Sequence, residues 1–153
     1  MQTNRIVESL LGTTAPAAVL VIRLLTGTIF LSEGIQKFLY PGDLGVGRFE
    51  KLGIIYPSIT APFVGTVEII CGILLLLGLL IRLAAIPLLI TMCVAIVSTK
   101  FNVLMESGFW KFAHEARTDY SMIMSLIFLL IVGAGSISLD NTIIKRRRSD
   151  ANT

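Results

Sequence analysis

Four long apolar runs, separated by shorter polar segments, dominate the pattern of the chain. They cover about Pro16–Leu39, Pro62–Ile81, Arg82–Phe101 and Thr118–Leu139. A helix of about 20 apolar residues spans the hydrocarbon of a bilayer, so each run is predicted to be a transmembrane helix. The second and third runs adjoin almost directly, which makes their helices antiparallel neighbours. The pattern therefore predicts an all-α, polytopic membrane protein, built as an antiparallel bundle of four transmembrane helices.

The loops after the first and third runs are the longest connections. Residues 41–61 contain the string RFEKLGI, Arg48–Ile54, which is predicted to form a short interfacial helix. Residues 102–117 contain the aromatic string GFWKF, Gly108–Phe112. Aromatic side chains with a polar edge favour the membrane–water interface, so this loop is predicted to anchor there.

Composition supports a single membrane domain. Hydrophobic residues make up 54% of the 153 residues, and the mean hydropathy is +0.83, both high for a soluble domain. We divide the chain into an interfacial N-terminal segment (residues 1–14), a four-helix membrane domain (residues 15–140) and a basic, disordered cytoplasmic tail (residues 141–153). The formal charge of +3 is modest, and nucleic acid is therefore not an expected partner.

The distribution of basic residues predicts the orientation in the membrane. Four spans place both termini on one side, and that side carries the cluster Lys145–Arg148 together with Arg5, Arg23 and Arg82. By the positive-inside rule this side is cytoplasmic. The opposite loops also contain basic residues, namely Arg48, Lys51, Lys111 and Arg117. Both termini are predicted to be cytoplasmic.

A polar stripe follows the first apolar run. Its residues recur at spacings of four and three, which places them on one face of a helix; they are Arg23, Gly27, Phe30, Gly34 and Lys37, with Glu33 at the border. Charges in hydrocarbon cost a few kcal/mol each, so this face is predicted to point inward. In the second run Gly65, Glu68 and Gly72 share a face where small residues admit a neighbouring helix closely.

Several ionisable side chains are predicted to lie in one layer near the non-cytoplasmic side. The candidate pocket residues are Glu33, Lys37, Glu68, Lys100, Asp119 and Tyr120. One interpretation is structural: Glu33 and Lys37 form an i, i+4 pair, and Glu68 bonds to Lys37, Lys100 or a hydroxyl of the first helix. The other is a pocket for a small or amphipathic ligand, such as a quinone headgroup.

Two arginines lie on the opposite, cytoplasmic side of the bundle. Arg23 either extends to the lipid headgroups or fixes the first helix to backbone carbonyls or an anionic lipid. We assign Arg23 and Arg82 as structural or lipid-facing charges.

Cysteine and histidine give little indication of a metal or redox centre. Cys71 and Cys93 both fall in apolar runs without CxxC spacing and are interpreted as buried hydrophobic residues, although their depths allow a disulfide. His114 is the single histidine, so no metal site is expected. No catalytic residue is assigned.

The strings IRLLTGTIFLSEGIQKF and VEIICGILLLLGLLIRLAAIPLLITM, the GFW string and the SLD string at Ser138–Asp140 resemble the DoxX family of small bacterial membrane proteins, over about Val21–Asp140. The family's R…G…F…G…K pattern falls on the polar stripe of the first run. Its E…G…G…R pattern falls on Glu68, Gly72, Gly78 and Arg82. Glu33 and Asn102 depart from the family pattern.

The resemblance implies a four-helix protein of the bacterial inner membrane that is the membrane subunit or anchor of a quinone-linked oxidoreductase system. Its partners would then be the lipid bilayer and a soluble or membrane-bound redox protein, and a homo-oligomer remains open. Two alternatives are a non-catalytic scaffold, which docks a soluble partner through its outer loops or basic tail, and a transporter-like unit for small molecules.

Overall fold

The computed structural model describes residues 11–150, and all regular structure in this range is helical. The elements are α2 (Val19–Leu39), α3 (Val46–Lys51), α4 (Pro57–Leu77), α5 (Ile81–Ser107), α6 (Phe109–Glu115), α7 (Arg117–Val132) and α8 (Leu139–Asp150). Most of the predicted interfacial segment, residues 1–14, lies outside the described residues. The predicted all-α class is confirmed.

Three helices, α2, α4 and α5, are long and apolar enough to cross a membrane. The fourth member of the bundle, α7, has 16 residues and is about 24 Å long, short of the roughly 30 Å of hydrocarbon. The predicted helix to Leu139 was too long because Gly133 and Gly135 adopt positive φ angles of 83° and 77°. These glycines end α7 and turn the chain beneath the bundle.

Other helix ends also differ from the prediction. The helix α4 begins at Pro57, a residue that suits a first helical position, and therefore takes Pro62 into its interior. The helix α5 continues to Ser107, and the end of α5 together with α6 occupies most of what was predicted as a loop. The predicted short helix after the first span is present as α3.

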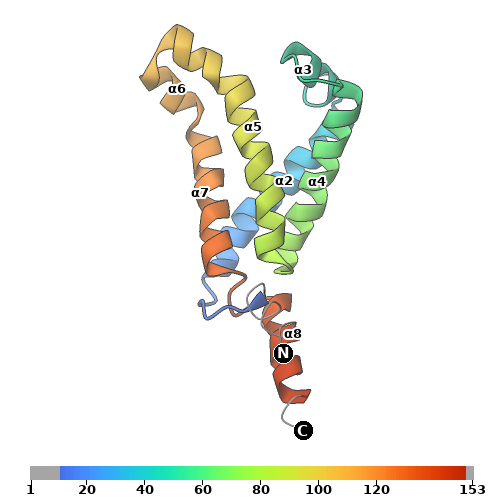
Figure 1. Cartoon of the computed structure of the whole chain (residues 1–153), viewed down its shortest axis with the longest axis vertical. Helices are drawn as coiled ribbons and strands as arrows, with labels where there is room; N and C mark the ends of the chain where they lie inside the picture. The colour runs from blue at the N-terminus through green and yellow to red at the C-terminus, as the bar shows by residue number, and fades with distance from the viewer. Residues whose placement is uncertain (1–10, 151–153) are drawn as a thin grey trace.

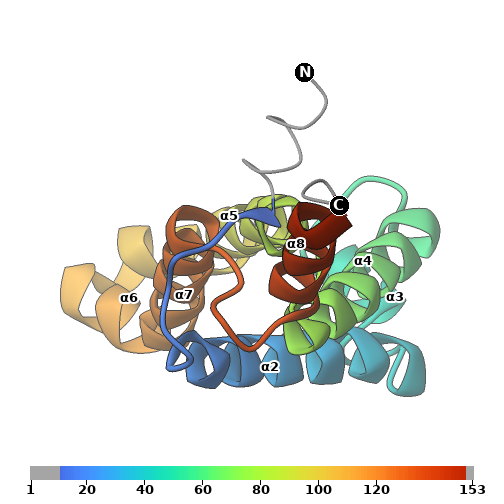
Figure 2. The ribbon, with the colours of Figure 1, turned by 90° about the horizontal axis from the view of Figure 1, so that it is seen from below.

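The bundle has the shape of a V (Figure 1). One arm consists of α2 and α4, and the other consists of α5 and α7. The arms meet at what we call the base, formed by the turn at residues 78–80 and the segment 133–138. Seen from below, α2 runs across the bundle from α7 to α4 (Figure 2), and it contacts both helices. The short helices α3 and α6 lie at the open end, on different arms.

Glycines allow α2 and α4 to cross in close contact. A Cβ atom on Gly34 would lie 2.7 Å from the carbonyl oxygen of Gly65, and one on Gly72 would lie 2.8 Å from the amide nitrogen of Leu31. Real Cβ atoms do not approach backbone so closely, so only glycine fits at these positions. The predicted inward faces of both helices are confirmed.

Arg23 is buried at the base, with 2% of its surface exposed. Its Nε and Nη2 donate to the carbonyls of Leu75 (2.9 Å) and Leu76 (2.8 Å), in the last turn of α4. Its Nη1 donates to the carbonyls of Ala134 (2.9 Å) and Ile137 (2.5 Å). Of the two roles predicted for Arg23, the contact with backbone carbonyls is the one observed, and the contact with lipid headgroups is not. The carbonyls at the end of α4 and in segment 133–138 need donors that the helices do not supply.

Arg82 supplies hydrogen-bond donors to the carbonyls in the last turn of α7, as Arg23 does for α4. Its Nε and Nη2 donate to the carbonyls of Leu130 (3.0 Å) and Ile131 (3.2 Å), and its Nη1 donates to the carbonyl of Gly12 (3.1 Å). A cation at a helix C-terminus also interacts favourably with the helix dipole. Arg82 is half-buried, and its contacts are those of a structural charge that joins α5 to the end of α7.

Asp140 stabilises the start of α5. Its carboxylate accepts hydrogen bonds from the N–H groups of Leu80 (2.9 Å) and Ile81 (3.5 Å), and its own N–H donates to the carbonyl of Gly78 (3.0 Å). Burial raises the pKa of the Asp140 carboxyl, whereas these two amides and the charges of Arg23 and Arg82 limit that rise. The SLD string at Ser138–Asp140 thus closes the base.

Replacing Asp140 with alanine is expected to lower the free energy of unfolding by about 1–3 kcal/mol, because the part-buried amide of Leu80 and the buried amide of Ile81 lose their acceptor. Unfolding of the purified protein in mixed detergent micelles, followed by circular dichroism, measures the change. The matched control is Asp43→Ala, since Asp43 is exposed in the loop after α2. Equal stability of the two variants would contradict the assignment of Asp140.

The predicted disorder of the tail is wrong for residues 141–150, which belong to α8. The hydroxyl of Ser138 accepts a hydrogen bond from the N–H of Asn141 (3.1 Å) and so caps the helix. Ile144 is buried and provides a packed anchor. A disordered tail would have neither a helix cap nor a buried apolar contact, so these two features explain why residues 141–150 are helical. Residues 151–153 lie outside the described range.

Candidate functional site

A cleft of about 500 Å³ lies between the two arms at the open end of the V. Residues of α2, α3, α4, α5 and α7 line it, together with parts of the loop that carries α3. Its walls are mostly apolar, and its inner part includes Phe30 and Met122, which are both buried. The volume lies in the range of small-molecule sites.

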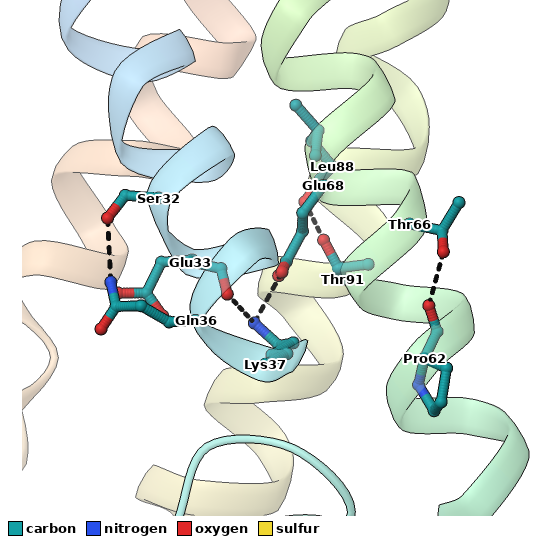
Figure 3. A network of polar contacts seen from close by, with 9 residues as sticks. All are labelled: Ser32, Glu33, Gln36, Lys37, Pro62, Thr66, Glu68, Leu88 and Thr91. Atoms are coloured by element: carbon teal, nitrogen blue, oxygen red, sulfur yellow. Dashed lines mark hydrogen bonds and ion pairs between the residues drawn. The ribbon is translucent and has the colours of Figure 1, made fainter. Parts of the chain in front are cut away.

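An ion pair between α2 and α4 forms part of the wall. Lys37 Nζ lies 2.6 Å from Glu68 Oε2, and the two side chains are only 12% and 8% exposed. Lys37 Nζ also lies 3.5 Å from the backbone carbonyl oxygen of Glu33. Figure 3 shows the lysine extending from α2 between these two acceptors. A buried pair of this kind leaves a costly unpaired charge when one partner is removed.

Lys37 and Arg48 are the strongest hydrogen-bond donors in the cleft. Four hydroxyl groups of the lining already donate to backbone carbonyls in their own segments; they belong to Thr60, Thr91, Ser98 and Thr99. These hydroxyls therefore present only acceptor lone pairs to a ligand. An ammonium group has three N–H donors, and Lys37 uses two of them in the contacts above. The cleft thus offers cationic donors to an acceptor-bearing ligand.

The structure brings together four of the six residues predicted for a pocket. Glu33, Lys37, Glu68 and Asp119 all line the cleft, although the chain separates them widely. Of the bonds predicted for Glu68, the one to Lys37 is observed. Glu33 contacts Lys37 through its backbone carbonyl, so its carboxylate does not form the predicted i, i+4 pair.

Lys100 and Tyr120 do not belong to the cleft. Lys100 Nζ lies 3.7 Å from Glu115 Oε2 of α6, because α5 continues into the predicted loop and α6 packs against it. Tyr120 is 64% exposed and does not line the cleft. Counted at about 1.5 Å per residue from the turn at residues 78–80, Lys100 lies about 15 Å nearer the open end than Glu68 and thus outside the predicted layer.

Sequence reasoning missed the contribution of the α3 segment, whose residues Leu44, Arg48, Phe49, Leu52 and Ile54 close one side of the cleft. The available signal was the mixed apolar and charged string RFEKLGI, which was interpreted only as an interfacial helix. Its apolar residues face the cleft because α3 packs on α4.

Cysteine and histidine take no part in the cleft. Cys71 is buried as predicted, whereas Cys93 is exposed on α5, and both thiols are free. The interpretation of Cys93 as buried was wrong, since α5 turns that side outward. His114 is exposed on α6. Residues 11–150 contain no group of three or more His, Cys, Asp or Glu side chains that could hold a metal ion.

Comparisons with known proteins place the chain among membrane proteins. The family model named DoxX matches residues 18–100. The chain is 54% identical over 143 residues to the "Uncharacterized membrane protein Rv3486" of Mycobacterium tuberculosis, covering 90% of this chain and 88% of that protein. It is 28% identical over 131 residues to "Putative oxidoreductase CatD" of Bacillus subtilis, covering 85% and 90%. No solved structure matches.

Proposed function

This chain belongs to the DoxX family of membrane proteins, and from that premise we propose that it is the membrane subunit or anchor of a quinone-linked oxidoreductase system. In this proposal the cleft between the arms holds a quinone headgroup. The name of the Bacillus subtilis relative, "Putative oxidoreductase CatD", supports the redox association. The chemistry of the cleft supports the choice of ligand.

The buried ion pair of Lys37 and Glu68 beside a cleft of about 500 Å³ is the observation that carries the proposal. A purely structural pair would be expected in a closed helix interface, whereas this pair borders open space. A quinone ring has apolar faces and carbonyl oxygens at its edge. Phe30 and Met122 offer apolar surface to the ring, and the remaining N–H of Lys37 offers a donor to a carbonyl.

We further propose that the base faces the cytoplasm of a bacterial inner membrane, so that the cleft opens toward the outer side. Arg23 and Arg82 lie at the base, and the basic residues Lys145–Arg148 follow in α8. The positive-inside rule supports this orientation. A redox partner on the outer side would then meet α3 and α6 at the open end.

Binding of a short-chain benzoquinone to the purified protein tests the proposed site. The variants Lys37→Met and Glu68→Gln are expected to weaken binding about tenfold or more. Lys37→Met removes the hydrogen-bond donor, and Glu68→Gln removes the carboxylate that positions the lysine. The matched controls are Lys100→Met and Glu115→Gln, which break the ion pair outside the cleft and leave affinity unchanged. Circular dichroism and thermal unfolding establish that each variant is folded.

Two results would overturn the proposal. The first is a wild-type protein that binds no benzoquinone at any accessible concentration. The second is equal affinity in the cleft variants and the controls, which would place the quinone elsewhere. If Lys37→Met and Glu68→Gln only lower the unfolding temperature, the ion pair is structural and the scaffold alternative is favoured.

A further inference from the structure

The two lateral sides of the cleft differ in chemical character. On the side between α4 and α5, Phe63, Ile90 and Val94 line the cleft and yet remain 66%, 59% and 53% exposed. A residue that both lines a cleft and is largely exposed lies at its edge. These three side chains therefore mark a lateral mouth, and all three are apolar.

The geometry of α4 and α5 explains this mouth. Both helices leave the turn at residues 78–80 in opposite chain directions and diverge toward the open end (Figure 1). At about 1.5 Å per residue from that turn, Phe63 and Val94 reach about the same height. Ile90 and Val94 are one helical turn apart and share a face of α5. The mouth thus lies along two helices that are long and apolar enough to cross a membrane, and its exposed apolar side chains suit contact with hydrocarbon.

The side between α2 and α7 is polar. Glu33 is exposed and Asp119 is half-buried, and both line the cleft. Contact between a charged carboxylate and a hydrocarbon chain is unfavourable. An alkyl or prenyl chain therefore has no apolar route past Glu33 and Asp119. The apolar route out of the cleft is the mouth between α4 and α5.

We propose that the ligand of the cleft is a quinone with a long apolar tail, and that it enters from the bilayer between α4 and α5. The ring lies toward Lys37 and Glu68, and the tail passes between Phe63, Ile90 and Val94 into the lipid. This inference rests on the proposed function, because it assumes a quinone in the cleft. It adds the substrate class and the entry route.

The test compares one benzoquinone ring carrying either a methyl group or a decyl chain. Val94→Trp places a bulky apolar side chain in the mouth without adding charge to the span. The variant is expected to bind the decyl compound about tenfold more weakly than wild type, because the chain cannot pass while the ring is seated. Binding of the methyl compound, which enters from the open end, is expected to stay unchanged.

Val97→Trp is the matched control, since Val97 is exposed on α5 but does not line the cleft. It is expected to bind both compounds like wild type. All affinities are measured at one detergent concentration, so that partition of the decyl chain into micelles is the same for every variant. Ile90→Trp provides a second mouth variant if Val94→Trp does not fold.

The outcomes separate the inference from the proposed function. If wild type binds both compounds and the mouth variants bind the decyl compound equally well, the entry route is wrong and the quinone site stands. If wild type binds neither compound, both proposals fail. If the mouth variants weaken decyl binding but Lys37→Met does not, an alkyl chain alone occupies the cleft, and the quinone class is wrong.

Discussion

Replacing Arg23 with methionine is expected to lower the free energy of unfolding by about 3–5 kcal/mol, the largest single-residue effect at the base. The guanidinium donates to four carbonyl oxygens, in the last turn of α4 and in segment 133–138. Because the site is buried, water does not easily replace these donors. The loss therefore separates α2 from α4 and from the segment that follows α7.

Unfolding in mixed detergent micelles, followed by circular dichroism, measures this effect. Arg23→Lys is expected to fall between wild type and Arg23→Met, because one ammonium group has fewer donors and no planar fork. The matched control is Arg117→Met: Arg117 is exposed and donates to the carbonyl of His114 in its own segment, so a change below about 0.5 kcal/mol is expected. If Arg23→Met lowers the free energy of unfolding by as little as the control Arg117→Met, the base is held together by other contacts.

The inward faces were predictable because hydrocarbon restricts where charge can lie. Arg23 and Lys37 had to share an inner face with the glycines between them, and the structure has this arrangement. Backbone carbonyls were one of the partners predicted for Arg23, but the segments that supply them were not predictable, because they lie far along the chain. A carbonyl acceptor has no signature in the amino-acid sequence. The sequence therefore indicated that Arg23 needed acceptors but not which segments provide them.

Counting residues from the helix ends predicted most of the candidate site but not all of it. Counting residues along each span placed Glu33, Lys37, Glu68 and Asp119 in one layer, and all four line the cleft. The same counting included Lys100, which lies nearer the open end and pairs with Glu115 of α6 instead. Direction around a helix depends on its neighbours and on its exact ends. Because α5 continues to Ser107, the neighbour of Lys100 is a helix that the sequence pattern did not indicate.

Replacing Gly34 with valine is expected to destabilise the α2–α4 arm by about 2–4 kcal/mol and to open the ion pair at the same time. A Cβ on Gly34 would meet the carbonyl oxygen of Gly65 at 2.7 Å and the amide nitrogen of Ile69 at 2.9 Å. Both atoms are backbone and cannot rotate away, so the helices must move apart. Lys37 and Glu68 lie one turn from this crossing.

Unfolding in mixed micelles and quinone affinity, measured on the same preparations, separate the two consequences of Gly34→Val. The matched control is Gly42→Ala, since a Cβ on Gly42 meets no atom within 4 Å, and it is expected to change neither quantity. Wild-type stability in Gly34→Val would mean that α2 and α4 are not closely packed in the membrane. Lost stability with unchanged quinone affinity would mean that the 2.6 Å contact of Lys37 with Glu68 does not depend on the glycine crossing, and that another contact aligns the two side chains.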